Sequence, residues 1–393
     1  MRLLVIVPDR LSDILTKGEY QPLYYNPGEI ADEVHILMTN DDAPDKEAMQ
    51  RTVGKAKLFL HNYPCDYSLP AARLPVLDSW RLRRWARGGV EIARRIQPDM
   101  IRCHSADWNA YLASRIKKEL GVPYCISLHI NPDVNTVARY AAPQSPQEQR
   151  HNAFYEYLEH QALSHASYIL PVYKPVLSYL QRHKISENRI KVCYNILNCY
   201  NLQKKENYSA GKTFHFICVG RLFTEKDPTN ILKAMVDLPD AKLTIVGDGP
   251  ARNRLESLAN QLSISDRVVF CPAIHNDDLC KMLPQQDAFV VHTEYYELNK
   301  SVLEALLTGL PLIINRRKGL PVPELVDADF VQFVDNTPES YRSAMQQIIE
   351  NDVAREALGK RAFSHARKHW DPAVAEAAYV NVYKQMLSEE HVH

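Results

Sequence analysis

Short apolar runs rich in β-branched residues alternate with longer amphipathic segments along nearly the whole chain. This alternation predicts parallel strands joined by crossover helices. In the first half, helices fit at residues 80–96 and 108–120, between such runs. The predicted strands are LLVIVP, EVHILMT, KLFLHNY, DMIRCH, YCISLHI, YILPVY and IKVCYNI in the first half, then FHFICVG, KLTIVG, RVVFCP, AFVVHT, LPLIIN and FVQFV.

The apolar period is lost once, over NCYNLQKKENYSAGK, which predicts a linker at residues 198–212. A chain of 393 residues suits two domains, each with its own core. We therefore predict an α/β protein of two Rossmann-like, doubly wound parallel-sheet domains, residues 1–197 and 213–372, that face a central cleft. A final helix over 373–393 is expected to cross back to the N-terminal domain.

Charge is balanced over the chain, with 47 Lys and Arg residues against 47 Asp and Glu residues. This balance creates no overall field that would attract nucleic acid or an anionic membrane, so any charged site has to be local. The 8 cysteines include no Cys-x-x-Cys pair, which is typical of reduced thiols in a cytosolic protein. The opening MRLLVIVPD predicts a first strand rather than a signal peptide, and no apolar run approaches the roughly 18 residues of a spanning helix. We expect a cytoplasmic protein with no nucleic-acid partner.

The segment FICVGRLFTEKDPTN predicts a buried strand that ends at Gly220, a short loop with Arg221 and Lys226, and a helix that starts at Asp227 and Pro228. Two cations then flank a helix start at the carboxyl edge of a sheet, where open α/β folds bind ligands. This pattern indicates an anion site. The alternative from these residues alone is a pair of solvated loop charges.

The next strand unit, KLTIVGDGPARNRLE, has a turn with Gly247 and Gly249 and a helix start at Pro250. The glycines allow either close approach of a ligand or simply a tight turn.

The strand AFVVHT leads to a third possible site. Asn299 is placed to cap a helix from Lys300 to about Thr308 that Gly309 closes. The first amides of such a helix, those of Lys300, Ser301 and Val302, favour phosphate oxygens. One turn further in, Glu304 either satisfies the helix dipole or accepts hydrogen bonds from a ribose diol.

Together these stretches resemble the retaining glycosyltransferases of family 4. The resemblance is carried by VGRLFTEKDP, LTIVGDGPARNRLE, RVVFCPAI, DAFVVHTEYYELNKSVLEALLTGLPLI and the tail VYKQML, and more loosely by PYCISLHINPD in the first half. It implies the GT-B fold, with an acceptor-binding N-terminal domain and a C-terminal domain that binds a nucleotide sugar.

The resemblance also implies roles for individual residues. Arg221 and Lys226 would hold the donor diphosphate, and His129 would face the reacting sugar from the first domain. The donor-binding residues would be Gly220, Arg221, Lys226, Gly247, Asn299, Lys300, Ser301, Val302 and Glu304.

Glu304 matches the second, ribose-binding glutamate of the family's E-x7-E element, and Glu297 is expected to be the first, which contacts the donor sugar. The spacing departs from the family's pattern, because six residues separate the two and Tyr296 fills the slot without a gap. We favour a loop that is one residue shorter. The loop after the first strand also lacks the paired glycines of many relatives, since Gly18 and Gly28 stand apart.

These residues suit transfer better than hydrolysis. A glycosidase places two carboxylates across the scissile bond and has no use for a cationic diphosphate cradle, whereas fixed cations lower the barrier for a departing nucleoside diphosphate. The resemblance implies retention by front-face attack, with no divalent ion required, and His129 as a catalytic residue beside Arg221, Lys226 and Glu297. An ordinary strand-end histidine is the alternative for His129.

We therefore expect a hexosyltransferase of polysaccharide biosynthesis that uses a UDP-sugar, or a GDP-sugar, and a glycan, lipid-linked or small-molecule acceptor. A nucleotide-sugar epimerase and a non-catalytic nucleotide-sugar-binding protein remain alternatives. The segment from Trp80 to Ile96 carries many arginines beside Trp80 and Trp85, which suits either an anionic bilayer surface or a solvated helix face. The segment 131–150 lacks an apolar period and predicts a mobile loop.

Overall fold

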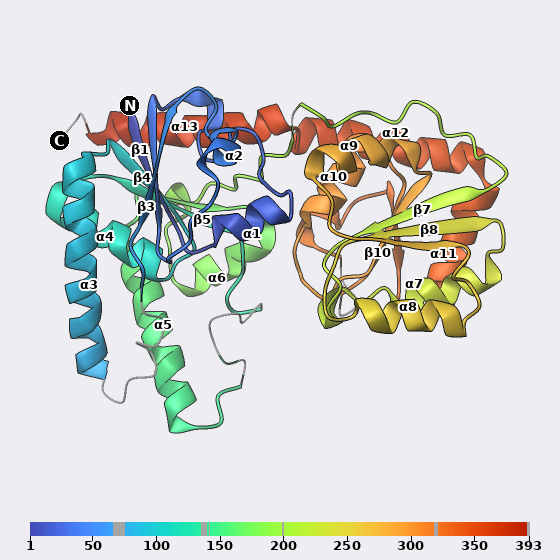
Figure 1. Ribbon diagram of the computed structural model, residues 1–393, viewed down its shortest axis with the longest axis horizontal. Helices are drawn as coiled ribbons and strands as arrows, with labels where there is room; N and C mark the ends of the chain where they lie inside the picture. The colour runs from blue at the N-terminus through green and yellow to red at the C-terminus, as the bar shows by residue number, and fades with distance from the viewer. Residues whose placement is uncertain (66–74, 135–139, 141, 199, 318–320, 391–393) are drawn as a thin grey trace. The chain divides into compact units, whose positions relative to one another are not determined.

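The computed structural model describes residues 1–65, 75–134, 140, 142–198, 200–317 and 321–390, so Cys199 and part of the predicted loop 131–150 lie outside the described residues. The chain forms two compact units (Figure 1). The first contains Met1–Thr16, Tyr20–Tyr194 and the C-terminal segment from Ala375. The second contains Lys17–Glu19 and Asn195–Val374.

The first unit is a six-stranded parallel sheet in the order β3-β2-β1-β4-β5-β6. Its strands are β1 (Arg2–Val7), β2 (Glu33–Met38), β3 (Lys57–Asn62), β4 (Met100–His104), β5 (Tyr124–Leu128) and β6 (Tyr168–Pro171). Its helices are α1 (Leu11–Thr16), α2 (Lys46–Gln50), α3 (Pro75–Ile96), α4 (Trp108–Leu120), α5 (Pro146–His165), α6 (Leu177–Arg182) and most of α13 (Pro372–Glu390).

The strand order of the second unit is β12-β11-β10-β7-β8-β9. Read from the β9 edge, it is the same order as in the first unit, with β7 in the place of β1. Its strands are β7 (Phe214–Val219), β8 (Ala241–Val246), β9 (Val268–Cys271), β10 (Ala288–Val291), β11 (Leu312–Asn315) and β12 (Val331–Val334). Its helices are α7 (Thr229–Ala234), α8 (Arg252–Gln261), α9 (Asn276–Met282), α10 (Lys300–Thr308), α11 (Pro338–Glu350) and α12 (Asp352–His369). The prediction of two doubly wound parallel sheets is confirmed.

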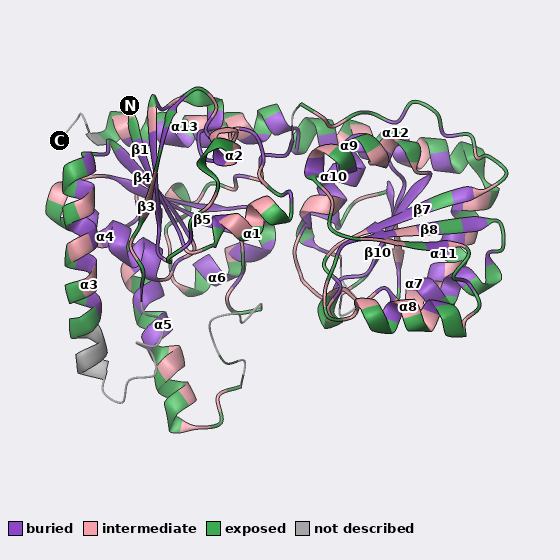
Figure 2. Ribbon diagram, viewed as in Figure 1, coloured by how far each residue is buried: buried purple, intermediate pink, exposed green. Residues whose placement is uncertain are grey.

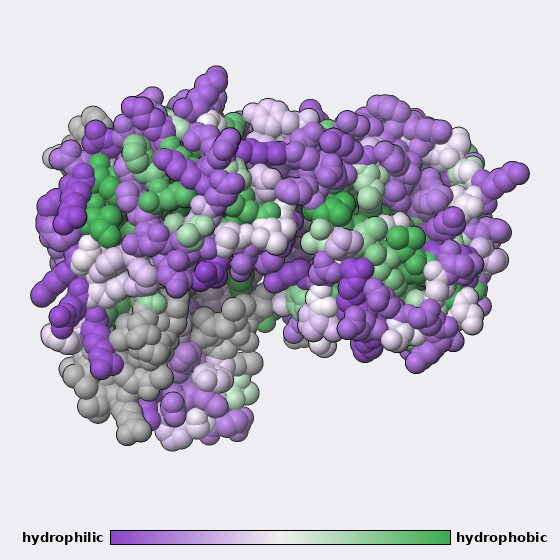
Figure 3. All heavy atoms as spheres, viewed as in Figure 1, coloured by the Kyte–Doolittle hydropathy of each residue, from purple (hydrophilic) through white to green (hydrophobic). Residues whose placement is uncertain are grey.

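Most strand residues of both units are buried (Figure 2). Parallel strands are covered by helices on both faces, which explains why they appear in the sequence as apolar runs rather than as alternating patterns. In the first unit α3 packs against α4, and α4 against α5. In the second unit α7 packs against α11 while α10 packs against α12. Hydrophilic side chains cover most of the face drawn in Figure 3.

Local sequence signals account for several helix ends. Ser145 and Glu148 form a reciprocal capping box at the start of α5. Asp107 accepts a hydrogen bond from the Asn109 amide at the start of α4, and Gly121 ends that helix in the left-handed region. The bounds of α4 are those predicted from the apolar period.

One predicted strand, IKVCYNI, is absent. Ile190 forms only an isolated bridge with Ile169. The amides of Lys191 and Cys193 then donate to Ile169 and Pro171 at 3.0 Å each, but no ladder follows. The run is apolar because Cys193 and Ile196 are buried, not because the segment is a full strand of the sheet.

The segment predicted as a linker contributes side chains to the second unit. Tyr208 is 5% exposed, and its hydroxyl donates to the Gly309 carbonyl at 2.9 Å. At the C-terminal end of the chain, Tyr379 of α13 donates to the Cys193 carbonyl at 3.1 Å, inside the first unit. No helix in the described part of the chain is both long enough and apolar enough to cross a bilayer.

Candidate functional site

The carboxyl edge of the second sheet is built around two loops that touch through glycine. Gly247 has φ +139°, and a Cβ there would lie 2.1 Å from the Gly220 carbonyl oxygen. Gly249 has φ +156°, and its Cβ would lie 2.2 Å from the Leu222 oxygen. The Leu222 amide donates to the Asp248 carbonyl at 2.9 Å. These glycines therefore permit one loop to lie against the other, which fixes the backbone on both sides of Arg221.

The two predicted cations are held by aromatic rings. The Arg221 guanidinium lies 4.9 Å from the Phe223 ring centroid, and the Lys226 ammonium lies 5.3 Å from that of Tyr295. The two rings are themselves 5.7 Å apart. Phe223 and Tyr295 were missed from the sequence, although both stand within the stretches that carry the resemblance. Cation–π contact keeps both charged groups at this edge.

Glu297 is the carboxylate that reaches this cluster. Its Oε1 lies 3.3 Å from Lys226 Nζ, and the two side chains are 18% and 16% exposed. The ion pair orients the ammonium and the carboxylate toward each other, and both side chains keep a small exposed fraction. Glu297 is therefore paired with one of the two cations of this edge.

The helix that follows starts and ends where the sequence predicts, because α10 spans Lys300–Thr308 and Gly309 closes it with φ +85°. Asn299 occupies the predicted cap position, but it makes no side-chain capping bond. The Asn299 side chain accepts no hydrogen bond from the helix amides, and its Oδ1 is buried with no partner among the described residues. The N-terminal turn of α10 is held to β7, because Ser301 Oγ donates to the Val219 carbonyl at 3.1 Å.

Two other predicted helix starts are shifted. The helix after β7 begins at Thr229 rather than Pro228, and the helix after β8 begins at Arg252, two residues beyond Pro250. Asp227 accepts from the Thr229 amide at 3.0 Å and from Arg254 at 2.6 Å. Its carboxylate therefore stabilises the loop, as a cap residue does, while the proline stays just outside the helix.

Glu304 is 2% exposed, one turn into α10. Its Oε1 accepts a hydrogen bond from Asn276 Nδ2 at 2.7 Å. Burial raises the pKa of the Glu304 carboxyl, against the opposing effects of the Lys300 charge and the Asn276 hydrogen bond. Asn276 opens α9 and was not identified from the sequence, since nothing local links it to a residue in a different helix. A buried carboxylate with one oxygen already bound offers its remaining acceptor capacity to a polar ligand.

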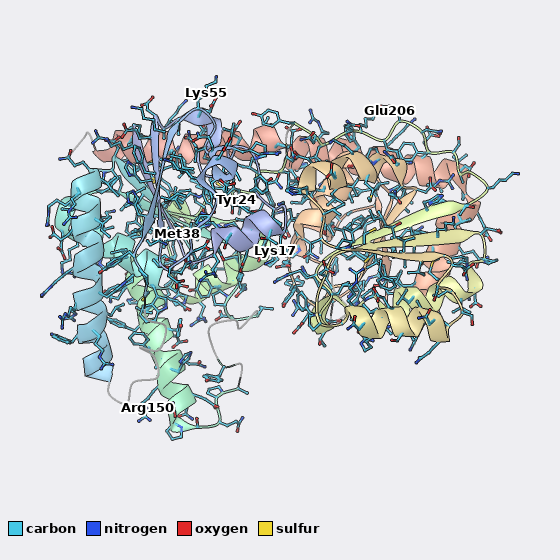
Figure 4. All side chains as sticks on the ribbon, viewed as in Figure 1. Lys17, Tyr24, Met38, Lys55, Arg150 and Glu206 are labelled. Atoms are coloured by element: carbon cyan, nitrogen blue, oxygen red, sulfur yellow. The ribbon has the colours of Figure 1, made fainter. Side chains whose placement is uncertain are left out.

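His129 lies in the first unit, at the end of β5. Its Nε2 is 3.3 Å from the Tyr24 hydroxyl, and its ring stacks on that of His104 at 5.3 Å between centroids. Tyr24, labelled in Figure 4, belongs to the segment between α1 and β2. Burial, and then the positive charge of Arg102, lower the pKa of His129 to about 3. Neutral imidazole is the form present at physiological pH.

Arg102 supports this histidine pair from inside the sheet. It is fully buried on β4, donates through Nε to Ser127 Oγ at 2.9 Å, and donates through Nη1 to the Tyr24 carbonyl at 2.9 Å. Burial, with the Arg102 charge, also lowers the pKa of His104. His104 could have been identified from the sequence as a neighbour of His129. The predicted strands DMIRCH and YCISLHI follow one another, and each has a histidine at or next to its carboxyl end.

The arginine-rich helix α3 presents fewer aromatic groups to solvent than its sequence indicates. Trp80 is 57% exposed, with the Arg84 guanidinium 5.7 Å from its ring. Trp85 instead donates through Nε1 to the Pro64 carbonyl at 3.1 Å and stacks on Tyr63. The exposed arginines are Arg81, Arg83, Arg84, Arg87, Arg94 and Arg95. Membrane contact through this helix stays a prediction.

Comparison with known proteins identifies both halves of the chain. Residues 31–195 match the glycosyl transferase 4-like domain, and residues 201–365 match the domain of glycosyl transferases group 1. An uncharacterized glycosyltransferase of Methanocaldococcus jannaschii is 24% identical over 304 residues, covering 73% of this chain and 75% of the relative. The sulfoquinovosyl transferase of Arabidopsis thaliana is 25% identical over 397 residues, covering 92% and 69%.

Solved structures agree on the fold. Sucrose-phosphate synthase from Thermosynechococcus elongatus superposes with a TM-score of 0.72 at 14% identity, over 99% of this chain and 100% of that one. The Anabaena protein HepE, solved in complex with UDP, gives 0.71 at 14% identity, over 98% and 100%. The fold is therefore GT-B, and the chain belongs to the glycosyltransferases, with a glycosyl transferase 4-like domain followed by a group 1 domain.

Proposed function

We propose that this protein is a retaining glycosyltransferase of family 4 that moves a hexosyl unit from a nucleoside-diphosphate sugar to an acceptor hydroxyl. The observation that carries the proposal is the cluster on the carboxyl edge of the second sheet. There Lys226 pairs with Glu297, and Arg221 lies on the neighbouring Phe223 ring. A diphosphate needs fixed positive charge as its bond to the sugar breaks, and this edge supplies it from two side chains and a helix start.

The strand order supports a proposed position for each part of the donor. Arg221 and Lys226 follow β7, Glu297 follows β10, and Glu304 lies in α10 beyond it. The diphosphate would lie over the loop after β7 and the first amides of α10, with Gly220, Gly247, Asn299, Lys300, Ser301 and Val302 around it. Glu297 would accept from sugar hydroxyls. Glu304, held by Asn276, would accept from the ribose diol.

In the reaction, the acceptor oxygen forms a bond to the anomeric carbon while the bond from that carbon to the phosphate oxygen breaks. We infer that attack occurs on the face of the leaving group, so that the departing phosphate takes the acceptor proton and configuration is retained. Arg221 and Lys226 would stabilise the charge that develops on the leaving oxygen. Neutral His129 would orient the sugar by a hydrogen bond, because a histidine whose pKa is lowered to about 3 does not carry a charge there.

UDP is our proposed nucleotide, with GDP as the alternative. HepE of Anabaena has been solved with UDP, with UDP and glucose, and with UDP-glucose. The sugars and acceptors named for relatives differ, from sulfoquinovosyl and kanosaminyl transfer to the synthesis of N-acetyl-glucosaminyl malate. The acceptor therefore stays open among a glycan, a lipid-linked acceptor and a small molecule, bound by the N-terminal domain.

Several finer expectations belong to the same proposal. Residues 1–197 form the acceptor domain, 213–372 the donor domain and 198–212 the linker, and the C-terminal helix returns to the first domain. The enzyme works in the cytoplasm without a divalent ion for the chemical step, since two side-chain cations already face the diphosphate position. We also propose peripheral membrane contact through residues 80–96, with Trp80 as the exposed aromatic side chain of this helix. The epimerase alternative is not favoured, because the family matches name transferases.

Calorimetry with UDP, GDP and their sugars would test the proposal, followed by transfer assays with the best donor. We expect micromolar to millimolar binding of one nucleoside diphosphate, transfer to an acceptor, the donor's anomeric configuration in the product by NMR, and activity that survives EDTA. Binding without transfer to any of a broad acceptor panel would favour a binding protein. Isomerisation of the donor without acceptor would favour the epimerase, and inversion would exclude the front-face mechanism.

A further inference from the structure

Arg317 lies beside the loop that carries Glu297. It follows β11 by two residues, and the loop 293–298 follows β10, the parallel neighbour of β11. Asn315 joins the two segments: its Oδ1 accepts from the Thr293 amide at 2.8 Å, and its Nδ2 donates to the Thr293 carbonyl at 3.0 Å. Arg317 and Glu297 therefore leave the sheet at the same edge, from neighbouring strands.

Among the residues that the structure describes, the Arg317 guanidinium has no ion pair and no hydrogen bond, and its Nη1 is buried. Burial lowers the pKa of Arg317, against the negative charges of Glu294 and Glu297 that act on it from a distance. Both carboxylates have nearer partners, Glu297 in Lys226 and Glu294 in His292. Burying a cation without a paired anion costs free energy. The position of Arg317 therefore points to an anionic ligand that pairs with its guanidinium.

The neighbouring Arg316 provides a contrast within the same segment. Its side chain is exposed, its Nη1 donates to the Phe333 carbonyl at 3.2 Å, and its guanidinium lies 5.3 Å from the Phe333 ring. Successive side chains of an extended chain point to opposite sides. Arg316 therefore serves the contact with β12, whereas Arg317 belongs on the other side, and the charges of Glu294 and Glu297 in the 293–298 loop act on it.

The order of strands separates Arg317 from the diphosphate cations. Along the edge, the loops after β11, β10 and β7 carry Arg317, then Glu297, then Arg221 and Lys226. Adjacent strands are about 5 Å apart, so Arg317 belongs to a strand roughly 10 Å from β7. With the diphosphate over the β7 loop and the sugar at Glu297, as proposed above, the Arg317 guanidinium would lie at the far end of the sugar.

We propose that Arg317 selects a donor whose sugar carries an oxyanion, a hexuronic acid with a C6 carboxylate being the simplest. The inference rests on the proposed function and names the substrate class of that same site. A guanidinium binds a carboxylate through two parallel, charge-assisted hydrogen bonds, which a neutral hydroxymethyl group cannot replace. Arg317 is thus a specificity-determining residue, while Arg221 and Lys226 serve every nucleoside diphosphate alike.

Calorimetry on the full chain tests this with donors that differ only at C6: UDP-glucuronate against UDP-glucose, and GDP-mannuronate against GDP-mannose. We expect the acidic member of the pair with the preferred base to bind on the order of 10-fold more tightly or better. Arg317→Gln removes this preference and leaves the affinity for the free nucleoside diphosphate unchanged. Arg317→Lys keeps only part of the preference, because an ammonium lacks the planar fork. Arg316→Gln, the matched control, keeps all of it, and thermal unfolding checks that each variant is folded.

The outcomes separate the two proposals. If nucleoside diphosphates bind but the wild-type protein prefers the neutral sugar or treats both alike, the selectivity of Arg317 is overturned and the transferase proposal stands. If Arg317→Gln weakens UDP or GDP itself by the same factor as the acidic donor, the guanidinium serves the diphosphate and the inference fails. If no nucleoside diphosphate or nucleotide sugar binds, both proposals fall together.

Discussion

The carboxyl edges of the two sheets share one strand order but differ in their electrostatics. At the carboxyl ends of β4 and β5 in the first unit stand His104 and His129, both with lowered pKa values, above the buried Arg102. In the second unit the edge carries Arg221 and the Lys226–Glu297 ion pair, all reached by solvent to some degree. The same fold therefore holds a pair of neutral histidines at the ends of β4 and β5 in one unit, and a cluster of charged side chains after β7 and β10 in the other.

The difference comes from what lies beneath each edge. Arg102 occupies the interior of the first sheet and is bounded by tyrosine rings, with Tyr379 at 4.6 Å and Tyr24 at 5.3 Å. Its positive charge opposes protonation of the two histidines. The second sheet is apolar at the equivalent depth, so its charged side chains extend from loops, where water and ligands can neutralise them. One edge suits a polar, uncharged hydroxyl, and the other suits a phosphate.

The largest expected effect is on the charged edge. Lys226→Ala should lower turnover on the order of 100-fold or more, because the leaving diphosphate loses a fixed cation in a poorly solvated position. Arg221→Ala should behave similarly. Steady-state kinetics measure the loss, with Lys242→Ala, an exposed strand position outside the site, as the control. Turnover unchanged in both site variants, with folding intact, would remove the electrostatic role of this edge.

A smaller effect is expected at the buried carboxylate of the second unit. Glu304→Gln should weaken nucleotide binding on the order of 10-fold, because hydrogen bonds to a charged acceptor are replaced by weaker ones. Since burial raises the pKa of Glu304, wild-type affinity should also fall as pH decreases through that raised pKa, earlier than for an ordinary carboxylate. Calorimetry across pH measures both, with the exposed Glu339→Gln as control. Equal affinities for wild type and Glu304→Gln would contradict a ribose contact.

The smallest effect concerns the neutral edge. Because the folded pKa of His129 is about 3, the unfolded chain binds a proton that the folded chain does not, between about pH 6.5 and pH 3. The contribution of neutral His129 to the free energy of unfolding should therefore be complete above pH 6.5 and fall as pH decreases through this window. The slope from this group is at most about 1.4 kcal/mol per pH unit. His104, whose pKa is also lowered, adds to it.

Denaturant unfolding as a function of pH should show a shallower slope for His129→Gln and His104→Gln than for the wild-type protein. Arg102→Met should raise the pKa of both histidines in NMR titrations, while burial keeps them below 6.5. Histidines that titrate near 6.5 in the wild-type protein would show that the two edges do not differ in the way described.

Features encoded by neighbouring residues could be predicted from the sequence. The helix α10, with its closing Gly309, and the cation pair Arg221 and Lys226 follow from short spacings. Prediction failed where a local rule met a tertiary constraint. Asn299 has the identity and position of a helix cap, yet its side chain does not cap, and the start of the helix is held to β7 by the hydrogen bond from Ser301 to Val219.

Pairs that are distant in the sequence were not predictable in the same way. Asn276 reaches Glu304 from a different helix, and Tyr295 meets Lys226 and the Phe223 ring from a different strand. The free guanidinium of Arg317 could not be distinguished from its neighbour Arg316, since two adjacent arginines in a sequence give no sign of which one is buried.

By itself, the sequence determined the two parallel sheets, their helices and the presence of cations after β7, because apolar period, caps and turn residues act over a few positions. Only the tertiary structure decided the state of the charges: that His129 stays neutral above Arg102, that Glu297 pairs with Lys226 and that Arg317 Nη1 is buried with no hydrogen-bond partner among the described residues. The physical reason is that desolvation and Coulomb interaction depend on which groups surround an atom in space, and these come from strands and loops far apart along the chain.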